Sequence, residues 1–366
     1  MSLLDYYRQF EGLSEKEVNA RLREEAAERR RKALTRVETL DLSQTTWPEL
    51  PHPRIVSAIT FVARRGLNRY PQLRGPDLRD ELARRHEIER DRVILGNGAA
   101  ELLMAAARTL IESGQRLLTA WPSYPLYPIM ARRAHGQAVP VSGGVEAMIE
   151  AAHEPDVRVV VLASPNDPTG ELVPAAGLRR LFEELPDDVA VLLDESLVEF
   201  ADAQPTDSSL ALLQSHSRLF VFRTFSKAWG LAGLRIGYAL GGPDSEALLA
   251  ELEPDLGVSE ISQAGALEAL RGCSELIMRR TQIICAERPR LTQALRERDF
   301  EVTDSQANFL WAAHASLEGG ELAARLERAG VLVAAGAALG EPQHVRIAIR
   351  DPTASSRLLS AVDKAL

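Results

Sequence analysis

The sequence predicts an α/β protein in which a three-layer α/β/α domain with a mainly parallel sheet is followed by a smaller α/β domain. Short apolar runs alternate with helical or loop segments, and such alternation is typical of a parallel sheet covered by helices on both faces. The length of 366 residues exceeds what one core usually holds, which favours a second domain. We expect an N-terminal arm at 1–46 that packs with the small domain, a large domain at 47–286 and a small domain at 287–366.

The expected elements follow in order along the chain. Ser14-Glu-Lys-Glu17 has the form of a capping box, which predicts a helix from Ser14 to Leu34. The large domain is expected to contain a helix at Asp77 to His86 and buried strands at Arg116 to Ala120, Val157 to Ala163, Val189 to Leu193 and Arg218 to Phe222. A long helical stretch over 259–299, kinked or divided at Pro289, comes next. The small domain is expected to contain strands at Phe309 to Ala312, Val331 to Ala334 and His344 to Ile349, with a helix at Glu321 to Ala329.

The composition argues against several classes of function. A net charge of −9 disfavours generic nucleic-acid binding. No apolar run approaches the roughly 18 residues of a membrane span, and the first residues lack the layout of a secretory signal, so we expect a cytoplasmic protein that does not enter a membrane. Cys273 and Cys285 are the only cysteines, which predicts neither a disulfide framework nor a metal site.

Polar side chains follow successive strands at the points where the strands end. In an open parallel sheet, ligands bind outside the carboxyl ends of the strands. The residues in these positions are Tyr124, Asn166, Asp167, Asp194, Glu195 and Lys227. We therefore expect them to lie around one ligand site.

One further segment predicts an anion site. Arg92-Val-Ile-Leu-Gly-Asn-Gly-Ala-Ala-Glu101 is typical of a strand that runs through two glycines into a helix, and the free amides of such a helix favour a phosphate. The pattern partly matches a dinucleotide-binding fingerprint. Glu101 replaces the third glycine of that motif, which disfavours the dinucleotide alternative.

The segment around Lys227 indicates which phosphorylated compound is bound. It reads Arg223-Thr-Phe-Ser-Lys-Ala-Trp-Gly-Leu-Ala-Gly-Leu-Arg-Ile-Gly-Tyr238, with hydroxyls on both sides of the lysine and an arginine after it. A lysine, a carboxylate at a neighbouring strand end, phosphate donors and an aromatic ring together predict a pyridoxal phosphate site. Lys227 would form the Schiff base and move the Cα proton, and Asp194 would keep the pyridine nitrogen protonated.

On these residues the chain resembles the fold-type I aminotransferases of class I and II, most closely the histidinol-phosphate aminotransferase branch. The matching motifs span 68–347 in the family's order. They are Asn68-Arg-Tyr-Pro71, Gly96-Asn-Gly98, Trp121-Pro-Ser-Tyr124, Ser164-Pro-Asn-Asp-Pro-Thr-Gly170, Asp194-Glu195, the Lys227 segment, Ser305-Gln-Ala-Asn-Phe309 and Val345-Arg-Ile347.

The resemblance implies a role for each matching residue. Thr224, Ser226, Arg235 and the amides of Ala99 and Ala100 would hold the cofactor phosphate, and Tyr124 would stack on the ring. Tyr70 would reach the cofactor of the other subunit, which implies a homodimer. Arg346 would pair with the substrate α-carboxylate, a task suited to a guanidinium fork, and Asn308 would also contact the substrate.

Several positions depart from the family pattern. Asp167 stands where the family has an asparagine that donates to the cofactor's O3′ oxygen, and Leu197 replaces a second donor, a tyrosine. Asn166, one residue earlier, is a candidate replacement donor. Ala334 replaces an arginine with which histidinol-phosphate aminotransferases bind the substrate phosphate, and Trp47 is a candidate for lining the side-chain pocket.

These motifs predict an aminotransferase that moves an amino group between an L-amino acid and a 2-oxo acid. The missing arginine disfavours histidinol phosphate and favours an aromatic or apolar amino acid. Two alternatives stay open at this point. One is a pyridoxal phosphate decarboxylase similar to the threonine-phosphate decarboxylases, and the other is a catalytically silent relative that binds the cofactor.

Overall fold

A computed structural model describes residues 14–34 and 38–366, and the chain divides into two compact units after Leu40. The first unit contains helix α2, Glu15–Leu34. The carboxylate of Glu17 accepts a hydrogen bond from the backbone N–H of Ser14 at 2.8 Å, as the capping-box pattern predicts. Residues 1–13 and 35–37 of the predicted arm lie outside the described residues, and the packing of the arm with the small domain stays a prediction.

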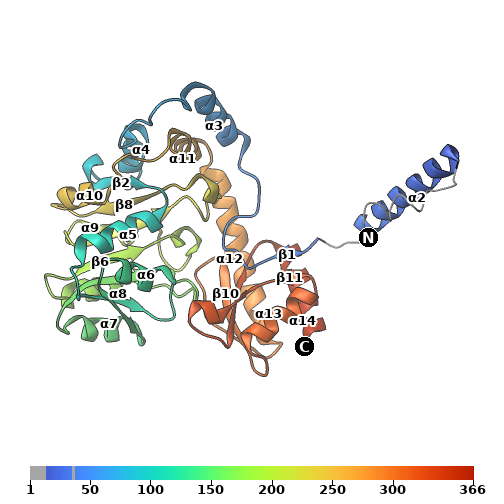
Figure 1. Cartoon of the computed structure of the whole chain (residues 1–366). Helices are drawn as coiled ribbons and strands as arrows, with labels where there is room; N and C mark the ends of the chain where they lie inside the picture. Colours follow the sequence, from blue (N-terminus) through green and yellow to red (C-terminus); the bar gives the residue numbers. More distant parts are fainter. Residues whose placement is uncertain (1–13, 35–37) are drawn as a thin grey trace. The chain divides into compact units, whose positions relative to one another are not determined.

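The second unit, residues 41–366, is built around a seven-stranded sheet (Figure 1). In order across the sheet, its strands are β2 Val93–Gly96, β8 Gly237–Gly241, β7 Leu219–Thr224, β6 Ala190–Asp194, β5 Val157–Ala163, β3 Arg116–Ala120 and β4 Gln137–Val141. Strand β8 is antiparallel to both its neighbours, and the other pairs are parallel. The mainly parallel sheet is therefore confirmed.

The sequence did not predict β4 and β8, for different reasons. Strand β4 lies at the sheet edge, contains Pro140 and has an exposed first residue, so its pattern is not that of a buried strand. Strand β8 begins and ends with glycine, and glycine has a low strand propensity. Packing against β2 and β7 decides its conformation, because all five of its residues are buried.

Helices cover both faces of this sheet, as the three-layer prediction requires. The helices around it are α3 Pro53–Gly66, α4 Pro76–His86, α5 Ala99–Leu110, α6 Leu126–Arg133, α7 Gly144–Ala152, α8 Ala175–Glu184, α9 Leu210–Leu213, α10 Glu246–Leu252 and α11 Glu260–Gly272. Leu192 and Phe220 on one face are fully buried, and so are Val191 and Val221 on the other. Alternate residues of a strand point to opposite faces, so both faces are shielded from water.

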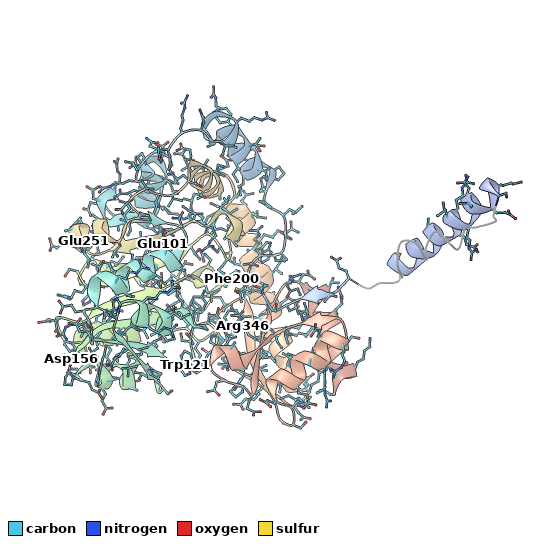
Figure 2. The ribbon with its side chains drawn as sticks, viewed as in Figure 1. Glu101, Trp121, Asp156, Phe200, Glu251 and Arg346 are labelled. Atoms are coloured by element: carbon cyan, nitrogen blue, oxygen red, sulfur yellow. The ribbon has the colours of Figure 1, made fainter. Side chains whose placement is uncertain are left out.

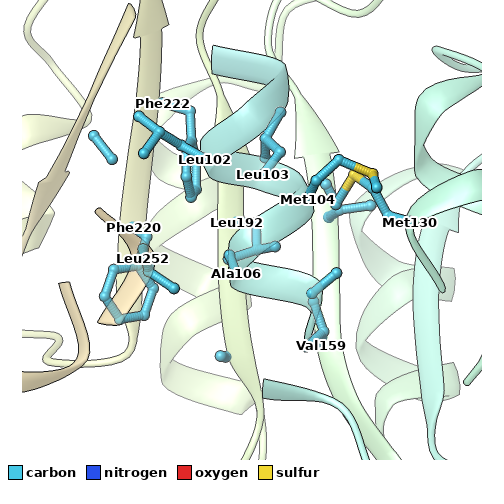
Figure 3. Packing of buried hydrophobic residues seen from close by; sticks show 14 of the residues in the cluster. Leu102, Leu103, Met104, Ala106, Met130, Val159, Leu192, Phe220, Phe222 and Leu252 are labelled. Atoms are coloured by element: carbon cyan, nitrogen blue, oxygen red, sulfur yellow. The ribbon is translucent and has the colours of Figure 1, made fainter. Parts of the chain in front are cut away.

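Helix α5 is fixed across the sheet by an apolar core (Figure 3). Leu102 and Ala106 of α5 pack in one cluster with Leu192 of β6 and Phe220 and Phe222 of β7. Each fully buried side chain of this size contributes about 1.5–3 kcal/mol. The core therefore holds the N-terminus of α5 beside the carboxyl ends of β6 and β7.

The region expected to form the small domain contains a four-stranded antiparallel sheet. Its strands, in order, are β12 Ala334–Ala335, β13 His344–Ala348, β10 Phe309–His314 and β9 Phe300–Val302, and the helices α13 Gly319–Arg328 and α14 Pro352–Ala365 complete the domain. The strand expected over 331–334 is wrong in one respect, because it is divided into β11, Val331–Leu332, and β12. In Figure 2, Arg346 of β13 lies where this domain meets the large sheet.

The long helical stretch breaks at a different residue from the one expected. Cys273, with φ −129°, separates α11 from α12, Ser274–Arg296, whereas Pro289 lies inside α12. A proline inside a helix removes one backbone hydrogen-bond donor. The burial of Ile284, Leu291 and Leu295 offsets this loss, so α12 continues past Pro289. The predicted domain boundary at 286/287 falls within this helix and stays a prediction. Among the described residues, no helix combines the length and apolar character that crossing a bilayer requires.

Candidate active site

A cavity of about 210 Å³ lies at the carboxyl ends of β6 and β7. The predicted site residues that line it are Ala99, Ala100, Tyr124, Asp167, Asp194, Thr224, Ser226, Lys227 and Arg235. They come from the start of α5 and from the segments that follow β3, β5, β6 and β7. The fold thus brings together residues that are up to 136 positions apart, from Ala99 to Arg235.

Lys227 lies three residues beyond the end of β7. Its Nζ donates a hydrogen bond to Oγ1 of Thr45, a buried residue in the segment that precedes α3. Burial lowers the pKa of Lys227, and the nearby carboxylate of Asp167 opposes this shift. A lower pKa increases the fraction of neutral amine, which is the nucleophilic form.

Asp194 is the last residue of β6 and points to the same face as Leu192, toward α5. Its carboxylate accepts hydrogen bonds from Tyr127 Oη at 2.9 Å and from the backbone N–H of Ser196 at 3.0 Å. Burial raises the pKa of Asp194, while these two bonds lower it. The two donors thus favour the ionised carboxylate in a place where burial alone would favour the neutral acid.

Tyr127 was missed in the sequence. It is fully buried in α6, and its ring meets that of Tyr124 edge to face, with centroids 5.8 Å apart. A signal was available, since Tyr127 lies in the first turn of α6, three residues after the predicted site residue Tyr124. Tyr124 itself is 39% exposed, and it presents its ring to the cavity.

An anion cradle lies on the other side of Lys227. Thr224 Oγ1 donates to Ser226 Oγ at 3.0 Å, and Arg235 approaches the same hydroxyl at 3.5 Å. The first amides of α5, at Ala99 and Ala100, open into the same cavity. Hydroxyls, a guanidinium and helix N-terminal amides form a suitable donor set for a phosphate.

Two glycines keep this cradle open. A Cβ on Gly98 would lie 2.5 Å from Arg235 Nη2, and one on Gly237 would lie 2.5 Å from the backbone nitrogen of Ala99. Gly98 also has φ 88°, which favours glycine. The residues present therefore fit a phosphorylated ligand, because both glycines leave room for the arginine and for the amides of α5.

Arg346 comes from β13, in the predicted small domain. Its Nη1 forms an ion pair with Asp167 Oδ1 at 2.5 Å, and its Nη2 donates to the backbone carbonyl of Ser43 at 3.2 Å. Asn308 donates to the carbonyl of Thr45 at 2.9 Å. Within the described residues, Arg346 Nε and Asn308 Oδ1 are buried without a hydrogen-bond partner. These two atoms mark Arg346 and Asn308 as candidates for contact with a further ligand.

Five predicted site residues do not line this cavity: Arg346 and Asn308, described above, and Asn166, Trp47 and Tyr70. The Asn166 amide donates to the Pro122 carbonyl and to Thr169 Oγ1, both at 3.0 Å, so this candidate donor is turned away from the cavity. The side chain of Trp47 lies against the Arg280 guanidinium at 4.8 Å, so it packs and does not line the pocket. Tyr70 is 86% exposed and borders a separate groove.

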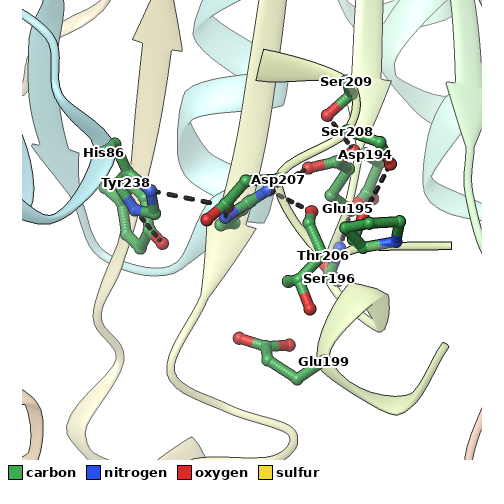
Figure 4. Close-up of polar contacts among 12 residues, drawn as sticks. His86, Asp194, Glu195, Ser196, Glu199, Thr206, Asp207, Ser208, Ser209 and Tyr238 are labelled. Atoms are coloured by element: carbon green, nitrogen blue, oxygen red, sulfur yellow. Dashed lines mark hydrogen bonds and ion pairs between the residues drawn. The ribbon is translucent and has the colours of Figure 1, made fainter. Parts of the chain in front are cut away.

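A buried polar network on the opposite face of the sheet links β6 and β7. It includes Glu195, which does not line the cavity, so the expectation that Glu195 lies around the ligand site is wrong. Arg223 of β7 donates to Glu195 at 2.9 Å and to Asp207 at 2.7 Å, and Ser209 donates to Glu195 at 2.5 Å (Figure 4). Breaking one partner of such a buried pair typically costs about 3–5 kcal/mol. Since Glu195 follows Asp194 and Arg223 precedes Thr224, the network holds the Asp194 carboxylate beside the anion cradle.

Within residues 14–34 and 38–366, no group of three or more His, Cys, Asp or Glu side chains is placed to hold a metal ion. The donors around the cavity are instead those that recognise an organic phosphate.

Comparison with known proteins identifies relatives of the chain. Residues 37–362 match the family model described as aminotransferase class I and II. An aromatic amino acid aminotransferase of Mycobacteroides abscessus is 37% identical over 249 residues, which cover 67% of this chain and 71% of that one. Histidinol-phosphate aminotransferase 2 of Ralstonia nicotianae is 33% identical over 308 residues, 82% of either chain.

The solved structures include a similar fold with a bound cofactor. The histidinol-phosphate aminotransferase of Sinorhizobium meliloti, in complex with pyridoxal-5′-phosphate, matches with a TM-score of 0.80 and 25% identity. The match covers 90% of this chain and 91% of that chain.

Proposed function

The chain belongs to the class I and II aminotransferases and uses pyridoxal 5′-phosphate, and from this premise we propose that its amino donors carry aromatic or apolar side chains. The acceptor in this proposal is a 2-oxo acid. The observation that carries the aminotransferase chemistry is one cavity in which Lys227, Asp194 and the anion cradle meet, and the substrate class rests on Ala334, as argued below.

The side chains around the cavity have distinct tasks in this reaction. Bound pyridoxal phosphate supplies a carbonyl that links to amines and a ring that withdraws electrons. Thr224, Ser226, Arg235 and the amides of Ala99 and Ala100 would bind its phosphate. The Asp194 carboxylate would hold the proton on the ring nitrogen, and Tyr124 would lie against the ring.

In this proposal, Lys227 is the reacting group of the chain. Its amine would attack the carbonyl and, once released, would take the proton from the substrate Cα and return it to the neighbouring carbon. The pKa lowered by burial suits both tasks, since each requires a neutral amine at some stage. Arg346 and Asn308 would contact the α-carboxylate, which the substrate carries on the same carbon as its amino group.

The substrate side chain is inferred from the position of Ala334. Ala334 lies directly opposite Arg346 in the antiparallel pair of β12 and β13, so both side chains share one face of the sheet. A methyl group offers no charge to a substrate phosphate. This favours an aromatic or apolar donor, as does the similarity to the aromatic amino acid aminotransferase of Mycobacteroides abscessus.

We expect the purified enzyme, loaded with pyridoxal phosphate, to convert its cofactor to the amino form when phenylalanine or tyrosine is added. Absorbance follows the conversion. Because Ala334 cannot pair with a phosphate, kcat/KM for histidinol phosphate should be lower than kcat/KM for phenylalanine by about tenfold or more.

The Ala334→Arg variant is the matched control, and it should raise kcat/KM for histidinol phosphate while leaving that for phenylalanine within a small factor. Release of carbon dioxide instead of an oxo acid would support the decarboxylase alternative. A protein whose absorbance does not change on adding the cofactor would refute the proposal.

We also propose that the active unit is a homodimer. Helix α3 and the loop after it expose large apolar side chains, which are Val56, Phe61, Leu67, Tyr70 and Leu73. Apolar groups gathered in this way are typical of an interaction surface. Tyr70 lines a groove of its own chain, apart from the cavity, which suits a residue that acts on a second copy. The cytoplasmic location also stays a prediction from the sequence.

Mixing two inactive variants tests this assignment. Lys227→Ala lacks the lysine and Tyr70→Ala lacks the tyrosine, so a mixed dimer would contain one site with Lys227 from one subunit and Tyr70 from the other. We expect subunit exchange to restore up to about a quarter of the wild-type activity, since half the dimers are mixed and each has one complete site. Activity that stays at the sum of the separate variants would place Tyr70 outside the shared site. Light scattering measures the oligomeric state in parallel.

A further inference from the structure

The amine of Lys227 is held by the hydroxyl of Thr45. Lys227 Nζ donates to Thr45 Oγ1, and within the described residues this is the one hydrogen bond that Nζ forms. Thr45 is 4% exposed, and a hydrogen bond shielded from water is stronger than one in solvent. The charged groups near the amine act on it without a hydrogen bond, so a neutral hydroxyl decides where the nitrogen lies.

The backbone around Thr45 is fixed at several points. The N–H of Leu42 donates to the Leu332 carbonyl at 2.8 Å, and the Leu42 carbonyl accepts from the N–H of Ala348 at 2.9 Å. Asn308 donates to the carbonyl of Thr45 itself at 2.9 Å. Hydrogen bonds of this kind hold a functional group more precisely than a free loop would. The hydroxyl of Thr45 is therefore a fixed point for the lysine nitrogen.

In the proposed reaction, the free amine of Lys227 is the species that moves the substrate proton. A neutral amine has two N–H bonds and one lone pair, and the lone pair takes the proton. A hydroxyl oxygen accepts a hydrogen bond from a neutral amine and from an ammonium alike. The bond to Thr45 can thus persist while the proton moves, and it leaves the lone pair free for the substrate Cα.

We propose that Thr45 is a positioning residue, whose hydroxyl holds the released Lys227 amine while it takes the Cα proton and returns it to the neighbouring carbon. The amine gains one proton and gives one back, so it is neutral again at the end, and Thr45 itself exchanges no proton. This inference rests on the aminotransferase activity proposed above. It assigns a task to a residue that does not line the cavity and acts through Lys227.

The Thr45→Val variant tests this role, because it keeps the shape of the side chain and removes the hydroxyl. We expect kcat for phenylalanine to fall by about tenfold or more in the cofactor-loaded enzyme, with KM nearly unchanged. The isotope effect from Cα-deuterated phenylalanine should rise, since proton transfer would limit the rate more strongly. Thr45→Ser keeps a hydroxyl and should restore kcat to within a few-fold of the wild type.

The matched control is Thr281→Val, which also removes a bonded hydroxyl. Thr281 Oγ1 donates to the Met278 carbonyl within α12 at 2.9 Å and lies outside the cavity, so kcat and the isotope effect should not change. Thermal unfolding and cofactor absorbance verify that each variant is folded and loaded. A folded Thr45→Val enzyme with the kcat and isotope effect of the wild type would overturn the proposal. A Thr45→Ser enzyme as slow as Thr45→Val would do the same.

A second readout requires neither cofactor nor turnover. Acetic anhydride labels the neutral amine of Lys227 in the cofactor-free enzyme, and mass spectrometry measures the labelling rate at each pH. The bond to Thr45 stabilises the ammonium, so its loss should lower the pKa of Lys227. The midpoint of labelling should therefore move to lower pH by about one pH unit in Thr45→Val and stay in place in Thr45→Ser.

The charged groups that face the amine are the same in both variants, and they are Asp167, Asp194, Arg235 and Arg346. A midpoint that does not move in Thr45→Val contradicts the positioning role. An enzyme that takes an amino group from no donor would count against the proposed function, whereas the labelling comparison would still judge Thr45.

Discussion

Replacing Lys227 with alanine is expected to lower kcat for amino-group transfer by at least about 10⁴-fold, because it removes both the covalent link to the cofactor and the group that moves the Cα proton. The rate of cofactor conversion with saturating phenylalanine measures the loss. The phosphate cradle does not include Lys227, so the variant should still bind pyridoxal phosphate, which dialysis and absorbance can detect.

Lys364→Ala is the matched control for this experiment. Lys364 is exposed near the end of α14, so its loss should leave both kcat and cofactor binding unchanged. A Lys227→Ala enzyme that keeps more than a few per cent of wild-type turnover would exclude Lys227 as the reacting amine.

The second large effect is expected from Asp194→Asn, with kcat lower by about 10³-fold. An amide carries no charge to hold the proton on the ring nitrogen, so the ring would withdraw electrons less strongly. KM should change little, because Asp194 does not contact the variable part of the substrate. Turnover of the folded variant above about a tenth of the wild-type value would mean that another group fulfils this task.

The Tyr127→Phe variant tests how activity depends on the ionisation of the Asp194 carboxylate. Burial raises the pKa of Asp194, and the bond from Tyr127 lowers it. Removing the hydroxyl should therefore raise the pKa, so that Asp194 is protonated, and activity lost, at a higher pH than in the wild type. The acid side of the kcat/KM profile shows the shift, and an unmoved profile would argue that Asp194 does not limit activity there.

Much of the site could be predicted from the sequence because its parts are local. One short segment contains Thr224, Ser226, Lys227 and Arg235. Two glycines just before Ala99 indicate that a helix begins there. Ligands bind at the carboxyl ends of parallel strands, and this rule was enough to predict that Tyr124 and Asp194 lie at the same site. No knowledge of side-chain packing was needed for these residues.

Other residues could not be placed in this way. The Asn166 amide has a choice of nearby partners, and the loop containing Pro122 and Thr169 satisfies it away from the cavity. Trp47 is a large amphipathic side chain, and the buried Arg280 provides a partner that no spacing in the sequence reveals. The helical stretch breaks at Cys273, although Pro289 is the residue that local propensity favours as a break. The position of the break therefore reflects packing.

The sequence by itself determined the fold class, the family and the cofactor-binding half of the site. These depend on strand and helix patterns and on motifs that act over a few residues. Only the tertiary structure decided how Arg346 is paired, that Tyr127 supports Asp194 and that Thr45 meets Lys227. The partners Asp167 and Arg346 are 179 residues apart, and Thr45 and Lys227 are 182 apart. Contacts at such separations are set by how the small domain and the strand-end loops pack, and local propensity does not encode that packing.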